Sequence, residues 1–307
     1  MPEDDWPFAG EARKSAFAVA YRMLGSVAEA EDVVQETLLR VHGASERGER
    51  IESPRAYAGT VAARLALDVL RSARVRRESY QGEWLPEPVV SDPGQDPQQH
   101  AEMADSLSLA FLVLLESLSP EQRAALLLHD VFGYGYDEVA RIVGKSEDNA
   151  RQLAARARRH VSERRPRFQS SREQRDELAR RFFAAAQEGD LAGLETLLAH
   201  GVTLHGDGGG KVPALARSLH GRSRVARTLL AWMRAGARIP GASMRQVEVN
   251  GQQGAVMLDG ESRVISVMAL DVGDDEIVAV RSIVNPEKLG HLGPVADLRE
   301  LLRPREV

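Results

Sequence analysis

Apolar and polar residues follow helical spacing through the first half of the chain. The clearest case runs from Glu31 to Val41, where valines and leucines recur on one side of a helix and charged residues on the other. The second side consists of Asp32, Gln35, Glu36, Leu39 and Arg40. Acids, an amide and an arginine around a solvent-facing leucine are typical of a partner-binding patch. An ordinary surface helix rich in Glu and Arg is the alternative, because spacing alone does not separate the two.

Two further helices are predicted around this stretch. One runs from Glu11 to Leu24 and forms a helical hairpin with it, and a long one begins at Ser53-Pro54, which supplies an N-cap and a first-turn proline. Tyr57, Val61, Leu65 and Val69 form the expected apolar stripe of the long helix. Its basic side chains, suited to phosphates or to stacking on bases of a single strand, are Arg64, Arg71, Arg74, Arg76 and Arg77. A solvated helix end is the alternative.

Residues 79–100 are predicted to be a linker, because prolines and a Ser-Asp-Pro-Gly turn replace the helical periodicity. Within it stands the segment Trp84-Leu85-Pro86-Glu87-Pro88. A tryptophan ring offers ~150–250 Å² of surface to bury, so this segment needs an apolar site. It either packs on the nearest helical module or docks on another part of the chain.

The next segment has the pattern of a helix-turn-helix. Ser119-Pro120-Glu121-Gln122 predicts a capped helix to about Phe132, Tyr136 to Val143 a short helix, and Ser146 the cap of a second helix from Glu147. Arg and Gln suit base edges, and further arginines suit phosphates. The residues expected to face DNA are Ser146, Arg151, Gln152, Arg156, Arg158 and Arg159. A purely structural two-helix corner is the alternative.

Beyond Arg172 the pattern becomes mixed. Helices are predicted at 173–187, 190–198 and 221–233, and strands at 202–205, 244–249, 254–258, 263–272 and 276–284. The joints Asn250-Gly251, Asp259-Gly260 and Gly273-Asp274-Asp275 contain the residues that tight hairpins use for positive φ. Helices followed by such a meander predict an α+β domain with a curved antiparallel sheet.

Composition narrows the possibilities. The 307 residues carry a net charge of −5 and no cysteine, which excludes disulfides and thiolate metal sites. No metal or cofactor site is predicted. From Lys145 to Arg167, however, eight Lys or Arg stand against three Asp or Glu, as expected of a nucleic-acid contact. The chain has neither a signal peptide nor an apolar run of membrane-spanning length, so we expect a cytoplasmic protein that does not contact a membrane.

Two sets of motifs resemble the extracytoplasmic-function sigma factors, a sigma-70 type family. The first is Ala20-Tyr21-Arg22-Met23-Leu24-Gly25 followed by Ala30-Glu31-Asp32-Val33-Val34-Gln35-Glu36-Thr37, and the second is Ser-Pro-Glu-Gln-Arg, Tyr-Asp-Glu-Val-Ala and Ala-Arg-Gln-Leu-Ala-Ala-Arg-Ala-Arg. The resemblance implies that the helix at 31–41 docks on core RNA polymerase. It also implies that the long helix and the loop before it, residues 42–52, melt and read the minus-ten promoter element, and that the helix-turn-helix reads the minus-thirty-five element.

The C-terminal part resembles the SnoaL-like cone domain that one sigma-factor subgroup carries. Three segments support this subgroup: Trp84-Leu85-Pro86-Glu87-Pro88, Asp207-Gly208-Gly209-Gly210-Lys211 and Asn285-Pro286-Glu287-Lys288-Leu289. The expected fold is therefore two all-α helical modules followed by an α+β SnoaL-like domain. The expected division is 1–78 for the first module, 79–100 for the linker, 101–168 for the second module, 172–290 for the cone domain and 291–307 for a tail.

These observations predict how the parts work together. The linker is expected to dock on the loops at 207–211 and 285–289, with Glu87 against Lys211 or Lys288, so that the cone domain modulates the sigma modules in cis. The tail, with leucines at near-helical spacing, is expected to add to this contact. An anti-sigma factor in trans is then not required. The expected partners are core RNA polymerase and promoter DNA, and a small-molecule ligand in the cone pocket is left open.

Two other functions are weighed. A helix-turn-helix regulator without polymerase docking would bind duplex DNA alone. An enzyme would use a base in the apolar pocket of the cone domain, for which the candidates are His205, Asp207, His220 and Asp259. Catalysis is the weaker prediction, because Asp in a Gly-rich loop or a hairpin turn is expected for backbone reasons alone.

Overall fold

The computed structural model describes residues 9–78, 80–91, 107–164 and 171–303. These form two compact units, each of which is built from two stretches of the chain. The first unit comprises Met1–Ser79 and Phe111–Arg165, and the second comprises Tyr80–Ala110 and Pro166–Val307. The segment after Ser79 therefore clusters with the C-terminal residues.

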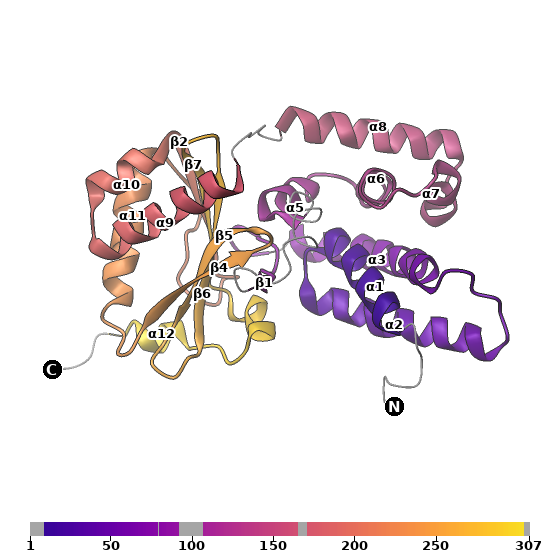
Figure 1. Cartoon of the computed structure of the whole chain (residues 1–307), viewed down its shortest axis with the longest axis horizontal. Coiled ribbons are helices and arrows are strands. Elements are labelled where there is room, and N and C mark those ends of the chain that lie inside the picture. The colour runs from indigo at the N-terminus through magenta and orange to yellow at the C-terminus, as the bar shows by residue number, and fades with distance from the viewer. Residues whose placement is uncertain (1–8, 79, 92–106, 165–170, 304–307) are drawn as a thin grey trace. The chain divides into compact units, whose positions relative to one another are not determined.

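The first three helices are α1 (Ala9–Leu24), α2 (Val27–Glu46) and α3 (Pro54–Glu78), shown in indigo to violet in Figure 1. Gly25 turns between α1 and α2 with a φ of 67°, and the Ser26 side chain caps α2 by accepting from the Glu29 amide at 3.2 Å. The expected apolar stripe of α3 is only half-buried, and the fully buried side is the one bearing Ala62, Ala66 and Leu67. Small side chains take this side because they let α1 approach closely.

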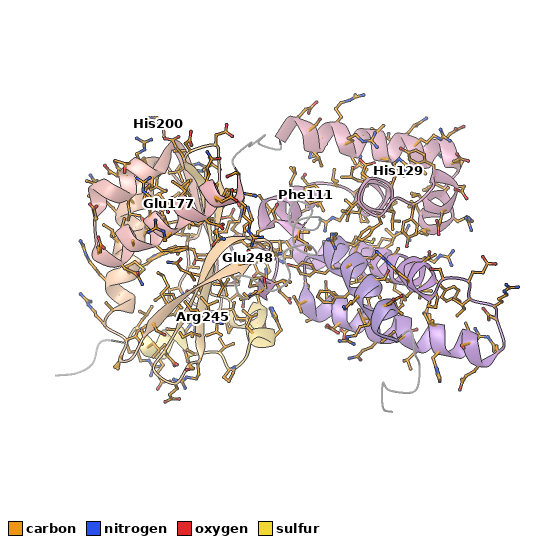
Figure 2. The ribbon with its side chains drawn as sticks, viewed as in Figure 1. Phe111, His129, Glu177, His200, Arg245 and Glu248 are labelled. Atoms are coloured by element: carbon orange, nitrogen blue, oxygen red, sulfur yellow. The ribbon has the colours of Figure 1, made fainter. Side chains whose placement is uncertain are left out.

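The second group of helices consists of α5 (Leu109–Leu115), α6 (Pro120–Leu126), α7 (Tyr136–Val143) and α8 (Glu147–Arg164). The capping box predicted at Ser119 is confirmed, with Gln122 as its reciprocal partner. The helix predicted to continue to Phe132 instead changes at Leu127–Val131 into a π-helical turn. There His129, labelled in Figure 2, stacks on Tyr136 with ring centroids 3.9 Å apart. This contact ties the end of α6 to the start of α7.

The second unit contains one seven-stranded sheet, in the order β1-β4-β5-β6-β7-β2-β3. Its strands are β1 (Val90–Ser91), β2 (Leu198–Asp207), β3 (Leu219–His220), β4 (Ser243–Val249), β5 (Gln252–Leu258), β6 (Val264–Val272) and β7 (Ile277–Ile283). The expectation of a wholly antiparallel sheet is wrong, because β2 pairs with β7 in parallel. β2 lies far from β7 in the sequence. The apolar pattern of a strand does not indicate whether its neighbour runs parallel or antiparallel to it.

Three helices pack on one face of this sheet: α9 (Arg172–Glu188), α10 (Leu191–Leu197) and α11 (Arg222–Gly236) (Figure 1). Phe182 and Phe183 of α9 are almost fully buried and meet edge to face, with centroids 5.3 Å apart. Leu229 and Leu230 of α11 pack into the same core. This layer is the main hydrophobic core of the second unit.

The hairpin joints differ in their backbone conformation. Asn250 and Gly251 have φ values of 53° and 72°, as predicted. At the next joint the positive φ belongs to Ser262, while Gly260 is needed because a Cβ there would lie 2.8 Å from the Pro240 carbonyl oxygen. Gly273 has no positive φ. The prediction of positive φ is therefore wrong at the second and third joints.

The residues after β7 form short elements rather than one helix. These are the 3-10 turns Pro286–Lys288 and Gly290–Leu292 and the helix α12 (Leu298–Leu301). Leu298 and Leu301 pack against Ile239, Ile265 and Ala296. The tail therefore covers an apolar patch of the second unit. Within the described ranges, no helix is long and apolar enough to cross a membrane.

Candidate functional site

The exposed side of α2 contains all five residues predicted to bind polymerase: Asp32, Gln35, Glu36, Leu39 and Arg40. Leu39 is 66% exposed, one of two large hydrophobic residues of the described chain that lie open to solvent. Arg40 donates to Glu36 at 2.7 Å, so this side of α2 combines an ion pair with the exposed apolar side chain of Leu39. The opposite side of α2 is buried through Val33, Val34 and Val41. The exposed side of α2 is therefore accessible to a partner.

Helix α8 presents the predicted reading residues to solvent. Arg151, Gln152, Arg156 and Arg159 are exposed, while the alanines on the other side of α8 are buried. Arg151 forms an ion pair with Glu147 and lies 5.1 Å from the Tyr136 ring centroid. The hydrogen bond to Glu147 raises the pKa of Arg151. These contacts orient the guanidinium across the first turns of the helix.

Two residues predicted to touch DNA also have structural partners. Arg158 makes a two-pronged bond to Asp130, with distances of 2.8 Å from Nε and 2.6 Å from Nη2. The bond to Asp130 raises the pKa of Arg158. The Ser146 hydroxyl accepts from the Asn149 amide at 3.3 Å and so caps α8. Both residues therefore help to position α8.

The basic residues of α3 fall into two groups. Arg64 and Arg71 are exposed as predicted. Arg71 donates to Glu121 of α6 at 3.1 Å and to Asp68 at 3.3 Å, so within the first unit it joins the two helical modules. The side chains of Arg74, Arg76 and Arg77 lie outside the described part of the chain.

Residues 80–91 of the linker belong to the second unit. Val90 and Ser91 add a short antiparallel strand to β4, a strand that sequence analysis did not predict. The Val89 amide donates to the Asn250 side-chain oxygen at 3.0 Å, and the Asn250 amide returns a bond to the Val89 carbonyl at 2.8 Å. At Pro88 the carbonyl oxygen lies 2.8 Å from a ring nitrogen of His291. Backbone bonds of this kind fix the linker regardless of its side chains.

Asp207 is the central residue of this contact. It is fully buried, and its carboxylate accepts from the Tyr80 hydroxyl at 2.6 Å, from the Leu85 amide at 2.8 Å and from the Lys288 ammonium at 2.6 Å. It also accepts from the Gly209 amide at 3.0 Å. Burial and the bond to Asp207 raise the pKa of the Tyr80 phenol above 10.0. One carboxylate thus joins the linker to both predicted loops.

Lys288 completes this cluster. Its ammonium also donates to the Leu85 carbonyl and lies 4.3 Å from the Trp84 ring centroid and 4.8 Å from that of Tyr80. A cation over two aromatic faces adds to the attraction of the ion pair. Asn285 donates to the Tyr80 hydroxyl at 2.8 Å. We call Tyr80, Trp84, Leu85, Asp207, Asn285 and Lys288 the linker latch.

The glycines between Asp207 and Lys211 are required by close approach. A Cβ on Gly209 would lie 2.3 Å from the Asn285 side chain, and one on Gly210 would lie 2.2 Å from Gln81. Lys211 forms its ion pair with Glu287 rather than with Glu87, because the two loops lie side by side. Glu87 itself is buried, at 8% exposure.

The candidate catalytic bases do not converge. His205 is 2.5 Å from Glu83 of the linker and 2.9 Å from the Thr203 hydroxyl, whereas His220 is exposed on β3. Asp259 accepts from Arg263 in its own turn. Burial opposes ionisation of Asp259, but the bonds from the Arg263 backbone and side chain outweigh it and lower the pKa. The described residues contain no cluster of three or more His, Asp or Glu suited to a metal.

Sequence reasoning missed three residues of this site: Tyr80, Glu83 and Asn250. Tyr80 had a usable signal, since an aromatic residue beside a Pro-rich segment needs a buried partner just as Trp84 does. Glu83 and Asn250 had no such signal. A glutamate is expected in a solvated linker, and an asparagine is expected in a turn.

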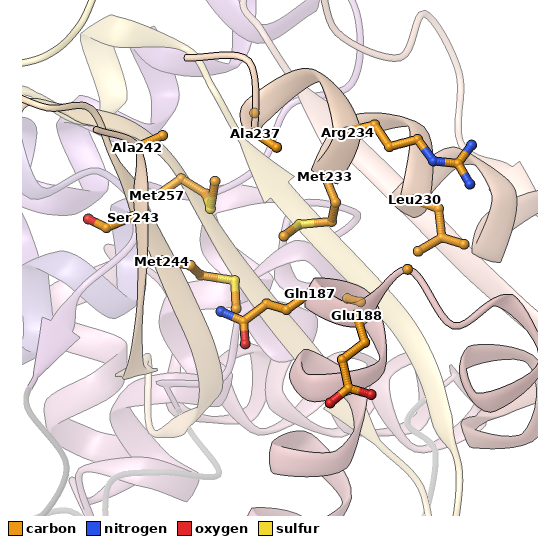
Figure 3. Close-up of a pocket in the computed structure, with 13 residues that line it drawn as sticks. Gln187, Glu188, Leu230, Met233, Arg234, Ala237, Ala242, Ser243, Met244 and Met257 are labelled. Carbon is orange, nitrogen blue, oxygen red and sulfur yellow. The ribbon is translucent and has the colours of Figure 1, made fainter. Parts of the chain in front are cut away.

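A separate cavity of about 460 Å³ lies among α9, α11, β4 and β5. Figure 3 shows Met233, Met244 and Met257 pointing into it, with Gln187 at its edge and Arg234 directed away. A second, small apolar pocket is lined by Phe182, Trp232 and Met268, among others. His205, Asp207, His220 and Asp259 do not line this cavity.

The helical unit, with the exposed side of α2 and a helix-turn-helix, has the architecture expected of a sigma-70 type transcription factor. Residues 11–76 match the model of sigma-70 region 2, and residues 108–161 match the model of sigma-70 region 4. The chain is 40% identical over 285 residues to the ECF RNA polymerase sigma factor SigJ of Mycobacterium tuberculosis, covering 90% of each chain. The chain therefore belongs to the ECF RNA polymerase sigma factors, as the motifs predicted.

Two further comparisons agree over most of the chain. A probable ECF sigma factor of the same species, SigI, is 32% identical over 277 residues, which is 89% of this chain and 91% of that one. The crystal structure of M. tuberculosis SigJ superposes with a TM-score of 0.72 at 36% identity, and the match covers 92% of this chain and 97% of that chain. The similarity thus includes the C-terminal domain, whose mixed sheet and helical layer agree with the predicted SnoaL-like cone.

Proposed function

We propose that this chain binds core RNA polymerase through the exposed face of α2 and directs transcription from promoters that α3 and α8 recognise. The observation that carries the first part is the open leucine, Leu39, beside the Arg40–Glu36 ion pair. The exposed arginines and Gln152 on α8 support major-groove reading. Such a factor would work in the cytoplasm, where polymerase and promoter DNA are.

Reconstitution tests this function. The purified chain should bind core polymerase and support run-off transcription from a promoter selected from genomic fragments. A conventional helix-turn-helix regulator would instead bind duplex DNA tightly by itself and leave core polymerase unbound. That result would replace the sigma-factor proposal.

We further propose that the second unit regulates the sigma modules in cis through the linker latch. The linker connects α3 to α5. The latch supports this role because it holds residues of the linker against the buried ion pair of Asp207 and Lys288. Any condition that weakens the latch would free the segment between the two helical modules and change their allowed spacing. Activity could then be set without an anti-sigma factor in trans.

Point variants test regulation better than truncation, because removing the tail would expose Ile239 and Ile265. Trp84→Ala and Asp207→Ala should each change the yield of run-off transcripts. Since both residues contact Lys288, their effects should be coupled in a double-mutant cycle. Strictly additive effects, or unchanged transcription in both variants, would contradict regulation through the latch.

We infer that the C-terminal domain is not catalytic. Two candidate bases are engaged at the linker, His205 by Glu83 and Asp207 by Lys288, and the large cavity lies elsewhere. The methionines and the amide of Gln187 around that cavity suit an apolar ligand with one hydrogen-bonding group. A ligand of this class should raise the melting temperature of the wild-type chain, and Met244→Asp should abolish the shift. A shift that persists in this variant would place binding elsewhere.

A further inference from the structure

The segment around α11 has an unusual charge distribution for an acidic chain. The 40 residues from Gly208 to Val247 contain eight Lys or Arg and no Asp or Glu, although the whole chain has a net charge of −5. A surface helix is ordinarily neutralised by acids three or four residues away. Here no acid is available within the segment, so the positive charge must be met from outside it.

Helix α11 gathers part of this charge into one line. Its inward side, Val225, Ala226, Leu229 and Leu230, is buried in the core of the second unit. The opposite side carries the exposed residues Arg224, Arg227, Ala231 and Arg234. Their spacing of three or four residues places them in one stripe, and at 1.5 Å per residue the stripe is about 15 Å long. We call these four residues the arginine stripe.

The arginines of the stripe have no acidic partner among the described residues. Arg222, one turn away on another side of α11, shows the contrast, because it pairs with Glu276 at 3.1 Å and donates to the Leu198 carbonyl at 2.6 Å. Arg224 and Arg227 are neighbours on the helix surface, so their like charges repel. The stripe therefore does not stabilise the fold and is available to an anionic partner.

We propose that the arginine stripe binds the sugar-phosphate backbone of promoter DNA. A strand has one phosphate per ~3.4 Å of helix axis, so a stripe of about 15 Å spans roughly four phosphates. Arginine suits this partner because its guanidinium forms paired bonds to phosphate oxygens. The stripe contains no large apolar residue, which disfavours insertion into a membrane or an apolar protein groove. The C-terminal domain thus adds affinity without reading sequence. This inference rests on the proposed promoter binding.

The salt dependence of promoter binding tests the stripe. In complex with core polymerase, the full chain carrying Arg224→Gln, Arg227→Gln and Arg234→Gln should bind promoter DNA more weakly, and by the same factor on a promoter and on a scrambled duplex. Each lost phosphate contact lowers the slope of log K against log salt by about 0.9, so three contacts lower it by about 2.7. The matched control removes the same charge from exposed arginines outside the stripe: Arg180, Arg299 and Arg303.

The outcomes separate this inference from the proposed function. If the wild-type chain fails to bind core polymerase, the proposed function is overturned. If core binding is intact and the stripe variant keeps the slope of the control, the stripe inference is overturned. If the variant loses affinity for core polymerase and not for DNA, the stripe meets an acidic protein surface, which also overturns it.

A second measurement locates the contact directly. The chain has no cysteine, so Ala231→Cys creates a unique thiol within the stripe. An iron chelate attached there should cleave promoter DNA at adjacent positions on addition of peroxide and ascorbate. The control, Ala184→Cys, places the same reagent at an exposed position of α9. Cleavage from position 231 but not from 184 is expected, and no cleavage from 231 would overturn the inference.

Discussion

Replacing Asp207 by alanine should undock the linker. The change removes a fully buried carboxylate that accepts from the Lys288 ammonium, itself at 6% exposure. The Tyr80 hydroxyl and the Leu85 amide lose an acceptor as well. Removing one member of a buried ion pair costs ~3–5 kcal/mol, because the remaining charge stays desolvated. At ~1.4 kcal/mol per factor of ten, the equilibrium for linker opening should rise by at least about a hundredfold.

Hydrogen exchange at the Val89 amide measures this opening at a position distant from the mutated residue. The Val89 amide donates to Asn250 at 3.0 Å and is protected only while the linker is docked. In Asp207→Ala its exchange should accelerate by about a hundredfold, since exchange follows the local opening equilibrium. The amide of Val267, in the central strand β6, should keep its wild-type rate and so control for global unfolding.

A second substitution tests whether the buried charge of Lys288 is the cause. Asp207→Ala combined with Lys288→Met removes both charges, and the thioether can still pack on the Trp84 ring. Replacing a buried pair by apolar groups is often close to neutral, so the double variant should recover much of the protection at Val89. Exchange within threefold of wild type in Asp207→Ala would refute the reasoning. So would a double variant that is no better protected than the single one.

Three other outcomes are expected. Charge reversal at Asp32 and Glu36 should weaken assembly with core polymerase in a pull-down titration. The melting temperature should stay nearly unchanged, because both side chains are exposed. Unaltered assembly would mean that polymerase binds another face. Arg156→Ala should reduce the free energy of promoter binding by ~1–3 kcal/mol and relax preference at particular base pairs. Arg158→Ala should weaken binding to all sequences, because it releases Asp130 and disturbs the position of α8. The protection factor of Val89, which is its exchange rate relative to an unstructured peptide at the same pH, should also fall as pH rises above 10.0. The raised pKa of Tyr80 contributes docking stability that is present below the unfolded pKa and lost as pH rises through the folded pKa. Tyr80→Phe should remove this fall in the protection factor, and a fall that persists would implicate another group.

Local spacing by itself determined which side of α2 is buried. The period of 3.6 residues separates Val33 and Val34 from Leu39 and Arg40 on α2, and burial in the structure follows it. Ser119 with Gln122, and Asn250 with Gly251, have the backbone roles that their side chains favour. These features are decided within a few residues, so they can be predicted without knowing the rest of the fold.

The tertiary structure decided the latch. Tyr80 and Asp207 are 127 positions apart, and Leu85 and Lys288 are 203 apart, so no local rule could pair them. The three motif segments could be singled out from the resemblance to one sigma-factor subgroup. The pairing of donors and acceptors required long loops to close around one core. Loop closure costs conformational entropy, and only the packing of the whole unit offsets that cost. For the same reason the parallel pairing of β2 with β7 could not be predicted from strand pattern.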